Sequence, residues 1–461
     1  MHAGFIRAGF WQLILPATFI AIATAAKIEA AERPNIVFIL ADDLGWTDLG
    51  CYGSTFYETP AIDELAAHGM RFTQAYTACP VCSPTRSSIM TGKYPVRTGI
   101  TDYIPGQHPA GVRLDTPYTR TELALDEFTV AEALREAGYL TFYSGKWHLG
   151  EAGYGPREQG FDVVVENDSL GDFKNDPLVG DRLTQTALQF LDKRDPAQPF
   201  FMFLSYHEPH RPIVDHPETI EHFRAKTEQA GGDDPQSIVE RRGFSRTVQN
   251  VAAYACEVAV LDSAVRQVVD RLQQQGVLES TVIIFTSDNG GLCTVDKPGP
   301  TTNLPLRSGK GWLYEGGIRV PLIVAAPGLT AAGSVCDAPM ISTDYYPTLL
   351  ELAGAPLRPE QHADGASIRP LLAGEARAAR PLYWHYPHYH GSKWTPGGAI
   401  RDGDWKLIEF WEEDTVELYN IASDIGEREN LAAMRPELVE ALRERLAAWR
   451  EETAAVMPTV K

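Results

Sequence analysis

The chain contains 461 residues, 44% of them hydrophobic, and carries a formal net charge of −20 at pH 7. Its length is sufficient for one large α/β domain and a smaller second domain. The acidic balance and the lack of a basic run argue against nucleic acid as a partner. A small anionic substrate remains compatible, because a local cleft can be positive on an acidic protein.

Residues 1–25 have the pattern of a secretory signal peptide. Arg7 provides a positive flank, residues 8–26 are largely apolar, and Ala23-Thr24-Ala25 suits a signal peptidase. An uncleaved membrane anchor is the alternative, but Gln12 and Pro16 interrupt a stretch that is already marginal in length. We therefore expect an exported protein, periplasmic or extracellular, without stable membrane insertion.

Four short apolar segments share one pattern, in which a run of strand-forming residues is followed directly by polar residues. They span residues 35–40, 140–143, 200–204 and 282–285. Such runs are typical of strands buried on both faces of a parallel sheet, and helical stretches such as 129–137 and 252–275 lie between them. The alternation predicts an α/β sandwich, in which ligands bind beyond the carboxyl ends of the strands. We expect the four polar clusters to converge there.

The first and last clusters predict a metal site. Asp42 and Asp43 follow the first run, and Asp288 and Asn289 follow the last. Two adjacent carboxylates repel each other unless a cation or hydrogen-bond donors compensate, although each pair alone is also compatible with a solvated turn. Together the four oxygen donors favour a hard cation. Ca²⁺ is preferred over Mg²⁺, because it tolerates irregular geometry and mixed carboxylate and amide ligands.

Residues 79–92, with the sequence CPVCSPTRSSIMTG, predict a helix that starts near a cysteine. Ser83 is a favourable N-cap and Gly92 a favourable end. Cys82 then lies at a helix N-terminus, which favours anions, with Arg86 on the same helix face. A redox pair with Cys79, half of a zinc site and a buried structural cysteine are alternatives, although no second metal-binding pair follows at the required spacing.

Cationic and imidazole side chains follow the two middle runs and a later turn. Lys146 and His148 lie between glycines after residues 140–143, and a solvated surface loop is the alternative reading. His207 and His210 follow residues 200–204, and one of the two can be purely structural. Lys310 has glycine on both sides, which keeps its ammonium group accessible.

The composition changes after about residue 375. Residues 399–410 and 416–420 predict antiparallel hairpin strands, and Pro436 opens a last helix with an apolar stripe. We therefore place a catalytic domain at 32–375 and a C-terminal α+β subdomain at 376–461. A group of aromatic and basic residues either rims the pocket or forms a surface loop: His385, His388, His390, Lys393 and Trp394.

The segment from Cys82 to Arg86 matches the pattern Cys-x-Pro-x-Arg, and the chain from about residue 33 to 317 resembles the type I, formylglycine-dependent sulfatases of the alkaline-phosphatase-like superfamily. The resemblance implies a large mixed, mostly parallel sheet sandwiched by helices, with a smaller C-terminal domain of antiparallel sheet and helix. It also implies that a formylglycine-generating enzyme converts Cys82 to formylglycine (3-oxoalanine).

The resemblance further assigns roles to the polar clusters. Ca²⁺ would be held by Asp42, Asp43, Asp288, Asn289 and the modified Cys82. Arg86, Lys146 and Lys310 would contact the sulfate. His148 and His210 would act as base and acid, in either order, and His207 would be a neighbouring substrate contact.

The predicted function is hydrolysis of an organic sulfate ester. Export and the aromatic C-terminal segment favour a sulfated carbohydrate as the substrate. A phosphodiesterase or phosphonate monoester hydrolase of the same superfamily is one alternative, since sulfate and phosphate have similar geometry. A non-catalytic secreted protein that binds sulfated glycans is the other.

Overall fold

The computed structural model describes residues 1–2, 33–165 and 169–461. Apart from its first two residues, the predicted signal peptide lies outside the described part of the chain. Residues Arg33–Lys461 form one compact unit, which carries every element discussed below. No helix among the described residues is long and apolar enough to cross a bilayer.

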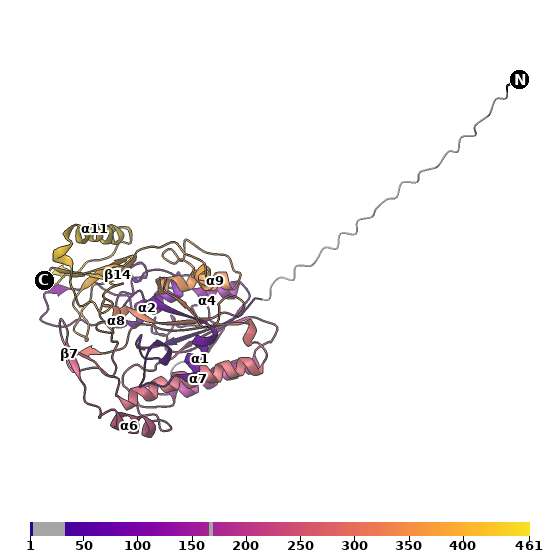
Figure 1. The fold of residues 1–461 in the computed structure, drawn as a ribbon, viewed down its shortest axis with the longest axis horizontal. Helices are drawn as coiled ribbons and strands as arrows, with labels where there is room; N and C mark the ends of the chain where they lie inside the picture. Colours follow the sequence, from indigo (N-terminus) through magenta and orange to yellow (C-terminus); the bar gives the residue numbers. More distant parts are fainter. Residues whose placement is uncertain (3–32, 166–168) are drawn as a thin grey trace. The chain divides into compact units, whose positions relative to one another are not determined.

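A mixed sheet forms the centre of this unit (Figure 1). Within the described residues it has nine strands, with β13 (Met340–Ile341) paired to β2. The other eight follow the order β12 (Ser334–Cys336), β2 (Met70–Tyr76), β11 (Arg319–Ala325), β9 (Thr281–Ser287), β1 (Asn35–Ala41), β6 (Phe200–Ser205), β4 (Leu140–Gly145) and β5 (Val163–Val165). The run from β9 to β5 is parallel, and β11 is antiparallel to both of its neighbours. The four apolar segments expected as buried parallel strands are therefore confirmed as β1, β4, β6 and β9.

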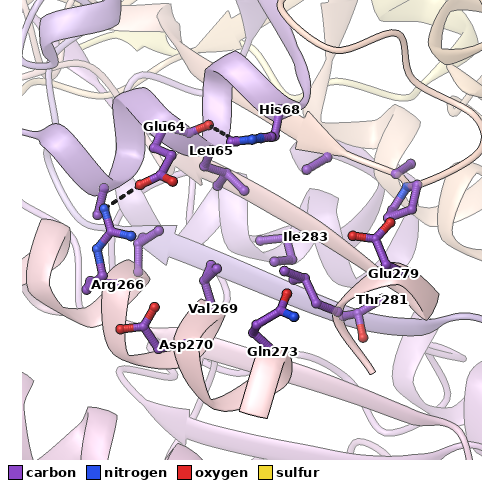
Figure 2. Close-up of a pocket in the computed structure, with 16 residues that line it drawn as sticks. Glu64, Leu65, His68, Arg266, Val269, Asp270, Gln273, Glu279, Thr281 and Ile283 are labelled. Atoms are coloured by element: carbon purple, nitrogen blue, oxygen red, sulfur yellow. Dashed lines mark hydrogen bonds and ion pairs between the residues drawn. The ribbon is translucent and has the colours of Figure 1, made fainter. Parts of the chain in front are cut away.

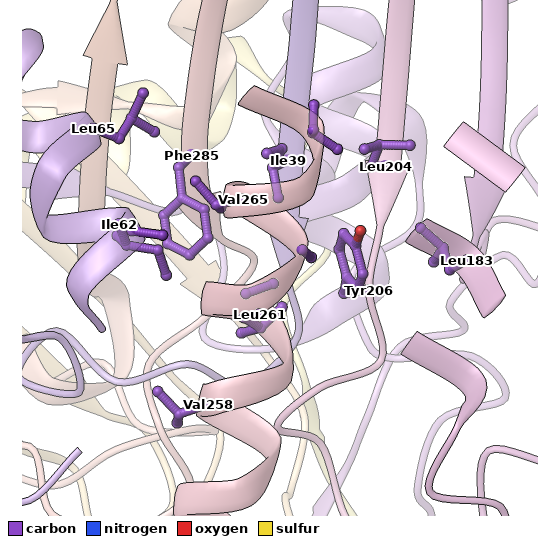
Figure 3. Packing of buried hydrophobic residues seen from close by; sticks show 14 of the residues in the cluster. Ile39, Ile62, Leu65, Leu183, Leu204, Tyr206, Val258, Leu261, Val265 and Phe285 are labelled. Carbon is purple, nitrogen blue, oxygen red and sulfur yellow. The ribbon is translucent and has the colours of Figure 1, made fainter. Parts of the chain in front are cut away.

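Helices cover both faces of the sheet. On one face lie α1 (Pro60–His68), α5 (Val179–Lys193) and α7 (Ala252–Gln274), and on the other lie α2 (Cys82–Thr91), α4 (Val130–Glu136) and α9 (Tyr345–Leu352). Alternate residues of β1 point to opposite faces, so that Ile39 packs with the first group and Phe38 with the second. Figure 3 shows Ile39 and Phe285 facing Leu261 and Val265 of α7. Each such side chain stabilises the fold by roughly 1.5–3 kcal/mol on burial.

The C-terminal residues form a four-stranded antiparallel sheet and a helix, as expected. The strand order is β14 (Leu382–Tyr386), β15 (Gly397–Asp402), β16 (Trp405–Phe410) and β17 (Thr415–Asn420), and α11 (Pro436–Glu452) follows. The shorter elements are α3 (Pro95–Thr98), α6 (Ile220–Gln229), α8 (Glu315–Ile318), α10 (Arg369–Leu372), β3 (Leu114–Asp115), β7 (Ser237–Val239), β8 (Phe244–Arg246), β10 (Thr294–Val295) and β18 (Thr459–Val460).

The C-terminal sheet shares a core with the main sheet. Trp312 and Tyr314, which follow the predicted substrate lysine, pack in one cluster with Trp384, Trp394 and Phe410 of the C-terminal part. A buried charge cluster joins the same two parts. The Nζ atom of Lys406 lies 2.9 Å from a carboxylate oxygen of Glu315 and 2.9 Å from one of Glu427, and all three side chains are inaccessible to solvent.

Helix α2 begins two residues earlier than its capping signal indicates. Its first residue is Cys82 and its N-cap is Val81, so the expectation that Ser83 caps the helix is wrong. The Ser83 hydroxyl instead accepts a hydrogen bond from the backbone N–H of Ile104 at 3.1 Å. Gly92 ends the helix with a φ of 68°, a left-handed conformation that glycine adopts easily. The placement of Cys82 at the helix N-terminus is confirmed.

Candidate active site

The two acidic pairs lie side by side because β1 and β9 are parallel neighbours. Ala41 pairs with Ser287 in the register, so Asp42 and Asp43 leave one strand beside Asp288 and Asn289 of the other. The backbone N–H of Asp43 donates to Asp288 Oδ1 at 3.3 Å, and Asn289 Nδ2 donates to Asp43 Oδ1 at 2.8 Å. Asp43 has a φ of 65°, which turns the chain sharply at this point.

Helix α2 places a thiol and a guanidinium against these carboxylates. Cys82 Sγ lies 3.4 Å from Asp42 Oδ1. One turn further on, Arg86 donates from Nε to Asp288 Oδ2 at 2.9 Å and from Nη1 to the carbonyl of Lys146 at 2.8 Å. Burial raises the pKa of the Cys82 thiol, and the charges of Asp288 and Asp42 raise it further. The unmodified side chain is therefore a protonated thiol at neutral pH.

Two lysines complete the charge balance. Lys146 follows β4 and forms an ion pair with Asp42. Lys310 Nζ lies 2.6 Å from Asp43 Oδ1 and 3.4 Å from Cys82 Sγ. Burial lowers the pKa of Lys310, but the charges of Asp43 and its neighbours outweigh that effect and raise the pKa above its ordinary value. Both ammonium groups therefore stay charged beside the thiol.

The histidines after β4 and β6 lie around the same point, in different environments. His148 Nε2 lies 2.6 Å from the carbonyl oxygen of Ile104, and His210 Nε2 lies 3.8 Å from Asp43 Oδ2. His207 stacks on the ring of Phe173, with centroids 4.2 Å apart. Burial lowers the pKa of His207 to about 3 and that of His210 to about 4, and it lowers the pKa of His148 well below its ordinary value. All three rings are neutral at pH 7.

The donor set fits a metal ion. Ligand atoms of Asp42, Asp43, Cys82 and His210 lie within 4.8 Å of one another. Asn289 Oδ1 is buried and has no hydrogen-bond partner among the described residues. A buried amide oxygen without a donor is costly unless a cation or another donor satisfies it. Its position beside two buried carboxylates fits a bound cation.

A cavity opens directly over this cluster. It has a volume of about 320 Å³ and is lined by Asp43, Cys82, Tyr103, His148, His210, Arg211, Leu292, Val295, Lys310, His390, Gly391 and Ser392. A second cavity of about 1060 Å³ shares Tyr103, His148 and His210 with it and continues past Lys146, Trp147, Phe173 and His207 to the loop 150–158. The cluster around Cys82 therefore faces a cleft formed by two adjoining cavities.

Comparison with known proteins identifies the family. The family model "Sulfatase" matches residues 34–355, and the model "N-sulphoglucosamine sulphohydrolase, C-terminal" matches residues 308–452. Human arylsulfatase A is 32% identical over 92% of this chain and 89% of its own length. The chain belongs to the sulfatase family. It is therefore an enzyme that hydrolyses sulfate esters, in a family that includes carbohydrate sulfatases.

Two further relatives have names or titles that include a carbohydrate. The N-acetylgalactosamine-6-sulfatase of Canis lupus familiaris is 30% identical over 87% of this chain and 77% of its own length. The crystal structure of Ps i-CgsB in complex with k-i-k-neocarrahexaose superposes with a TM-score of 0.75, at 28% identity over 91% of this chain and 93% of that chain. The solved relative thus has the same fold, including the smaller C-terminal sheet.

The sulfatase structure brings together the site residues expected from the sequence. Asp42, Asp43, Cys82, Arg86, Lys146, His148, His210, Asp288, Asn289 and Lys310 all lie at the carboxyl ends of the central strands or at the start of α2. His207 lies one step away, in the wall of the larger cavity. Of the aromatic and basic C-terminal group, only His390 lines the cavity over Cys82.

Other members of that C-terminal group have structural contacts. His388 lies 2.9 Å from the Thr101 hydroxyl, His385 lies 3.0 Å from the carbonyl of Val456, and Trp394 is buried in the shared core. The sequence reading missed Tyr103, Arg211 and Ser205. Ser205 ends β6 and lies 2.5 Å from Arg86 Nη1, and its place at a strand end was the one available signal.

A third cavity lies at the opposite end of the strands. It has a volume of about 410 Å³ and is lined by α1, α7 and the first residues of β9, as Figure 2 shows around Leu65, Val269 and Thr281. Glu64 and Arg266 form an ion pair of 2.6 Å at its edge. Thr281 begins the strand that Asp288 follows, so this cavity is remote from the candidate active site.

Proposed function

We propose that this sulfatase is exported and removes sulfate from a sulfated carbohydrate outside the cell, using formylglycine made from Cys82 together with a bound Ca²⁺. The observation that carries the proposal is the convergence of Cys82, Lys310 and Asp42: Cys82 Sγ lies 3.4 Å from both the ammonium group and the carboxylate. A catalyst for sulfate ester cleavage needs cations around the sulfate oxygens and a nucleophile aligned with the leaving alcohol.

The unmodified thiol is poorly suited to this reaction. Its raised pKa keeps it protonated, and a thiol that accepted the sulfuryl group would have no easy way to release it. The hydrated aldehyde of formylglycine supplies an oxygen nucleophile and a second hydroxyl through which sulfate can be released. Cys82 is only 1% exposed, so the formylglycine-generating enzyme would have to reach it before the domain folds.

Seven further side chains have complementary roles in this proposal. Ca²⁺ would be held by Asp42, Asp43, Asp288 and Asn289, together with the modified Cys82, and would polarise the oxygens near residue 82. Arg86, Lys146 and Lys310 would neutralise the charge on the sulfate group.

The hydrogen bonds of His148 support its role as a base. The carbonyl of Ile104 can only accept, so Nε2 of His148 carries the proton of the neutral ring. The other nitrogen, Nδ1, then has a free lone pair, and it has no partner among the described residues. We assign His148 as the base and His210 as the acid that protonates the leaving oxygen. A bound sulfate ester brings a negative charge that favours the protonated form of His210.

The carbohydrate part of the proposal rests on the cleft. The two adjoining cavities share Tyr103, His148 and His210, so a chain of sugars could extend from the reacting sulfate past Trp147 and Phe173. Aromatic and polar side chains in one cleft suit sugar rings, which have both apolar faces and hydroxyl groups. The predicted signal peptide is consistent with a substrate outside the cell.

Turnover of 4-nitrophenyl sulfate and 4-nitrophenyl phosphate by the purified protein tests the reaction class, and a panel of defined sulfated mono- and disaccharides tests the substrate class. We expect hydrolysis of the aryl sulfate and of at least one sugar sulfate. The mass of the Cys82 peptide should show formylglycine. Cys82→Ala should abolish turnover, whereas Cys79→Ala, the matched cysteine control, should retain it. A strong preference for phosphate, or an unmodified Cys82 in protein from the native host, would contradict the proposal.

A further inference from the structure

His390 is a residue of the C-terminal part that reaches the cavity over Cys82. It lies in the loop between β14, which ends at Tyr386, and β15, which begins at Gly397. The ring lines the same cavity as Cys82 and Lys310 and is half-buried. It therefore contacts the active-site cleft from outside the region that supplies the metal and sulfate contacts.

The protonation of the ring is fixed by one backbone group. The N–H of Ser392 donates to Nδ1 of His390 at 3.2 Å, and the Ser392 hydroxyl lies 2.7 Å from the same nitrogen. A backbone N–H can only donate, so Nδ1 must carry a lone pair. The neutral ring then holds its proton on Nε2. No described residue forms a hydrogen bond with Nε2, which leaves this N–H available to a ligand in the cavity.

Packing closes the Nδ1 side of the ring. A Cβ atom built on Gly311 would lie 2.1 Å from His390 Nδ1, so only glycine fits next to the imidazole, and Gly311 directly follows Lys310. Tyr103 meets the ring edge to face, with centroids 5.8 Å apart. The ring is therefore held in one orientation between two loops, which is the condition for a directional hydrogen bond to a substrate.

The ring stays uncharged in this environment. Burial, with a smaller effect from the positive charge of Lys310, lowers the pKa of His390 to about 3. A neutral N–H is a directional donor that adds no charge to the cleft. The cations that suit the sulfate group, Arg86, Lys146 and Lys310, are all gathered at Cys82 and the carboxylates.

We infer that His390 is a specificity-determining residue that donates from Nε2–H to a sugar oxygen of the leaving alcohol. This inference rests on the proposed function, because it presumes a sulfated carbohydrate in the cleft. A neutral donor recognises a hydroxyl or ring oxygen without favouring a second anion, so it selects among alcohols and does not contribute to binding the sulfate group. An aryl sulfate, whose leaving group has no sugar oxygen, should not use this contact.

Two substitutions distinguish the contribution of Nε2 from that of Nδ1. In His390→Gln the side-chain amide nitrogen can occupy the place of Nε2 and keep a donor there. In His390→Asn the amide reaches only the place of Nδ1. We expect His390→Asn to lower kcat/KM for the best sulfated sugar of the panel roughly tenfold, the effect of one lost hydrogen bond, and His390→Gln to stay within about threefold. Ser392→Ala, which keeps the backbone donor, should also stay within about threefold.

4-Nitrophenyl sulfate provides the internal comparison. All of these variants should hydrolyse it within about threefold of the unsubstituted enzyme, which also shows that they fold. An equal loss on sugar and aryl substrates would overturn the assignment, because His390 would then act on the chemistry common to both. Equal kcat/KM for the Gln and Asn variants on the sugar, or a wild-type enzyme that cleaves the aryl sulfate but no sugar sulfate, would overturn it as well. Failure of the wild type on every sulfate would instead contradict the proposed function.

The tautomer can be measured without any turnover. In protein labelled with ¹⁵N-histidine, the ring signals of His390 are identified by their loss in His390→Gln. We expect the pattern of a neutral ring protonated on Nε2 throughout the range from about pH 5.5 to 8. A ring protonated on Nδ1, or one that gains a proton within that range, would remove the basis of the inference.

Discussion

Arg86 binds one oxygen of Asp288 through two nitrogens: Nε lies 2.9 Å and Nη2 lies 2.7 Å from Asp288 Oδ2. Its remaining nitrogen, Nη1, donates to the carbonyl of Lys146 and lies 2.5 Å from the Ser205 hydroxyl. One planar side chain thus joins the ends of three strands. A lysine at this position could supply the charge but not the three directions.

The first prediction uses this geometry. Arg86→Met leaves the carboxylate of Asp288 buried without its cation and should lower the free energy of unfolding by about 3–5 kcal/mol. Arg86→Lys keeps the charge and should retain most of that stability, yet lose at least about a hundredfold in kcat/KM because the site is no longer preorganised. Urea unfolding and aryl sulfate turnover measure the two effects. Wild-type turnover in Arg86→Lys would show that the planar guanidinium group is dispensable.

The second prediction concerns the proposed metal. Removal of Ca²⁺ with a chelator should abolish turnover and lower the melting temperature, because an ion that binds the folded state and not the unfolded one stabilises the folded state. Ca²⁺ should restore both better than Mg²⁺. Asn289→Ala, which removes the buried amide oxygen, should need a higher Ca²⁺ concentration for half-restoration. Asp270→Asn, an exposed carboxylate on α7, is the control and should respond like the wild type. If turnover and melting temperature of an exhaustively dialysed enzyme did not change with the chelator, the assignment of a bound Ca²⁺ would be contradicted.

The third prediction is a pH dependence of stability from His388. This ring is inaccessible to solvent, lies 2.9 Å from the Thr101 hydroxyl, and has a pKa lowered to about 3, chiefly by burial. In the unfolded chain a histidine titrates near pH 6.5, so between about pH 6.5 and 3 the unfolded state binds the extra proton. Acid therefore favours unfolding, and the contribution of this histidine to stability is fully present only above about pH 6.5.

Comparison of two variants isolates that effect. Protonation of His388 in the unfolded state lowers the free energy of unfolding of the wild type by about 2 kcal/mol between pH 7.5 and pH 5. His388→Asn does not lose this amount, so the difference in free energy of unfolding between the two proteins should shrink by about 2 kcal/mol. Thr101→Val removes the same hydrogen bond but keeps the imidazole. The difference in free energy of unfolding between this variant and the wild type should therefore stay nearly constant between the two pH values. Urea titrations at the two pH values provide the measurement. A gap for His388→Asn that does not change with pH would mean that the ring is not neutral in the folded state.

The fourth prediction concerns the buried charge cluster of Lys406, Glu315 and Glu427. Lys406→Met should lower the free energy of unfolding by about 3–5 kcal/mol, since Glu427 then loses its cation and Glu315 keeps only the ion pair with Arg319 at 3.3 Å. The double variant Lys406→Met/Glu427→Gln should be less destabilised than Lys406→Met alone, because it removes one of those charges. Arg445→Met breaks an exposed pair with Asp402 and should cost less than about 1 kcal/mol. A double variant no more stable than the single one would show that packing, not charge, dominates.

The convergence of the candidate metal ligands and cations could be predicted because these residues lie next to strands with an obvious pattern. Asp42 and Asp288 follow unbroken apolar runs, and parallel neighbours bring such positions together whatever the rest of the chain does. Tyr103 and His390 could not be found that way. They reach the cavity from loops whose course depends on tertiary packing, and histidines of the same segment, His385 and His388, were indistinguishable from His390 before the structure showed which one faces the cleft.

The helix start shows the same limit on a smaller scale. Ser83 carries every local signal of an N-cap, yet its hydroxyl bonds the backbone of Ile104, twenty-one residues away. Local propensity predicted the existence and the end of the helix. A tertiary contact decided where it begins.

The hydrogen bond from Trp312 Nε1 to the carbonyl of Ser392, at 2.7 Å, ties the Lys310 loop to the loop that carries His390. These two loops are therefore a matched pair, although about eighty residues separate them in the chain. A chimaera that exchanges only the part after residue 375 with a relative would bring in a new wall for the cleft and also disturb the lysine next to Cys82. Libraries aimed at new sugars should therefore randomise both loops at once. A change in one loop alone would leave it packed against an unchanged partner that no longer fits it.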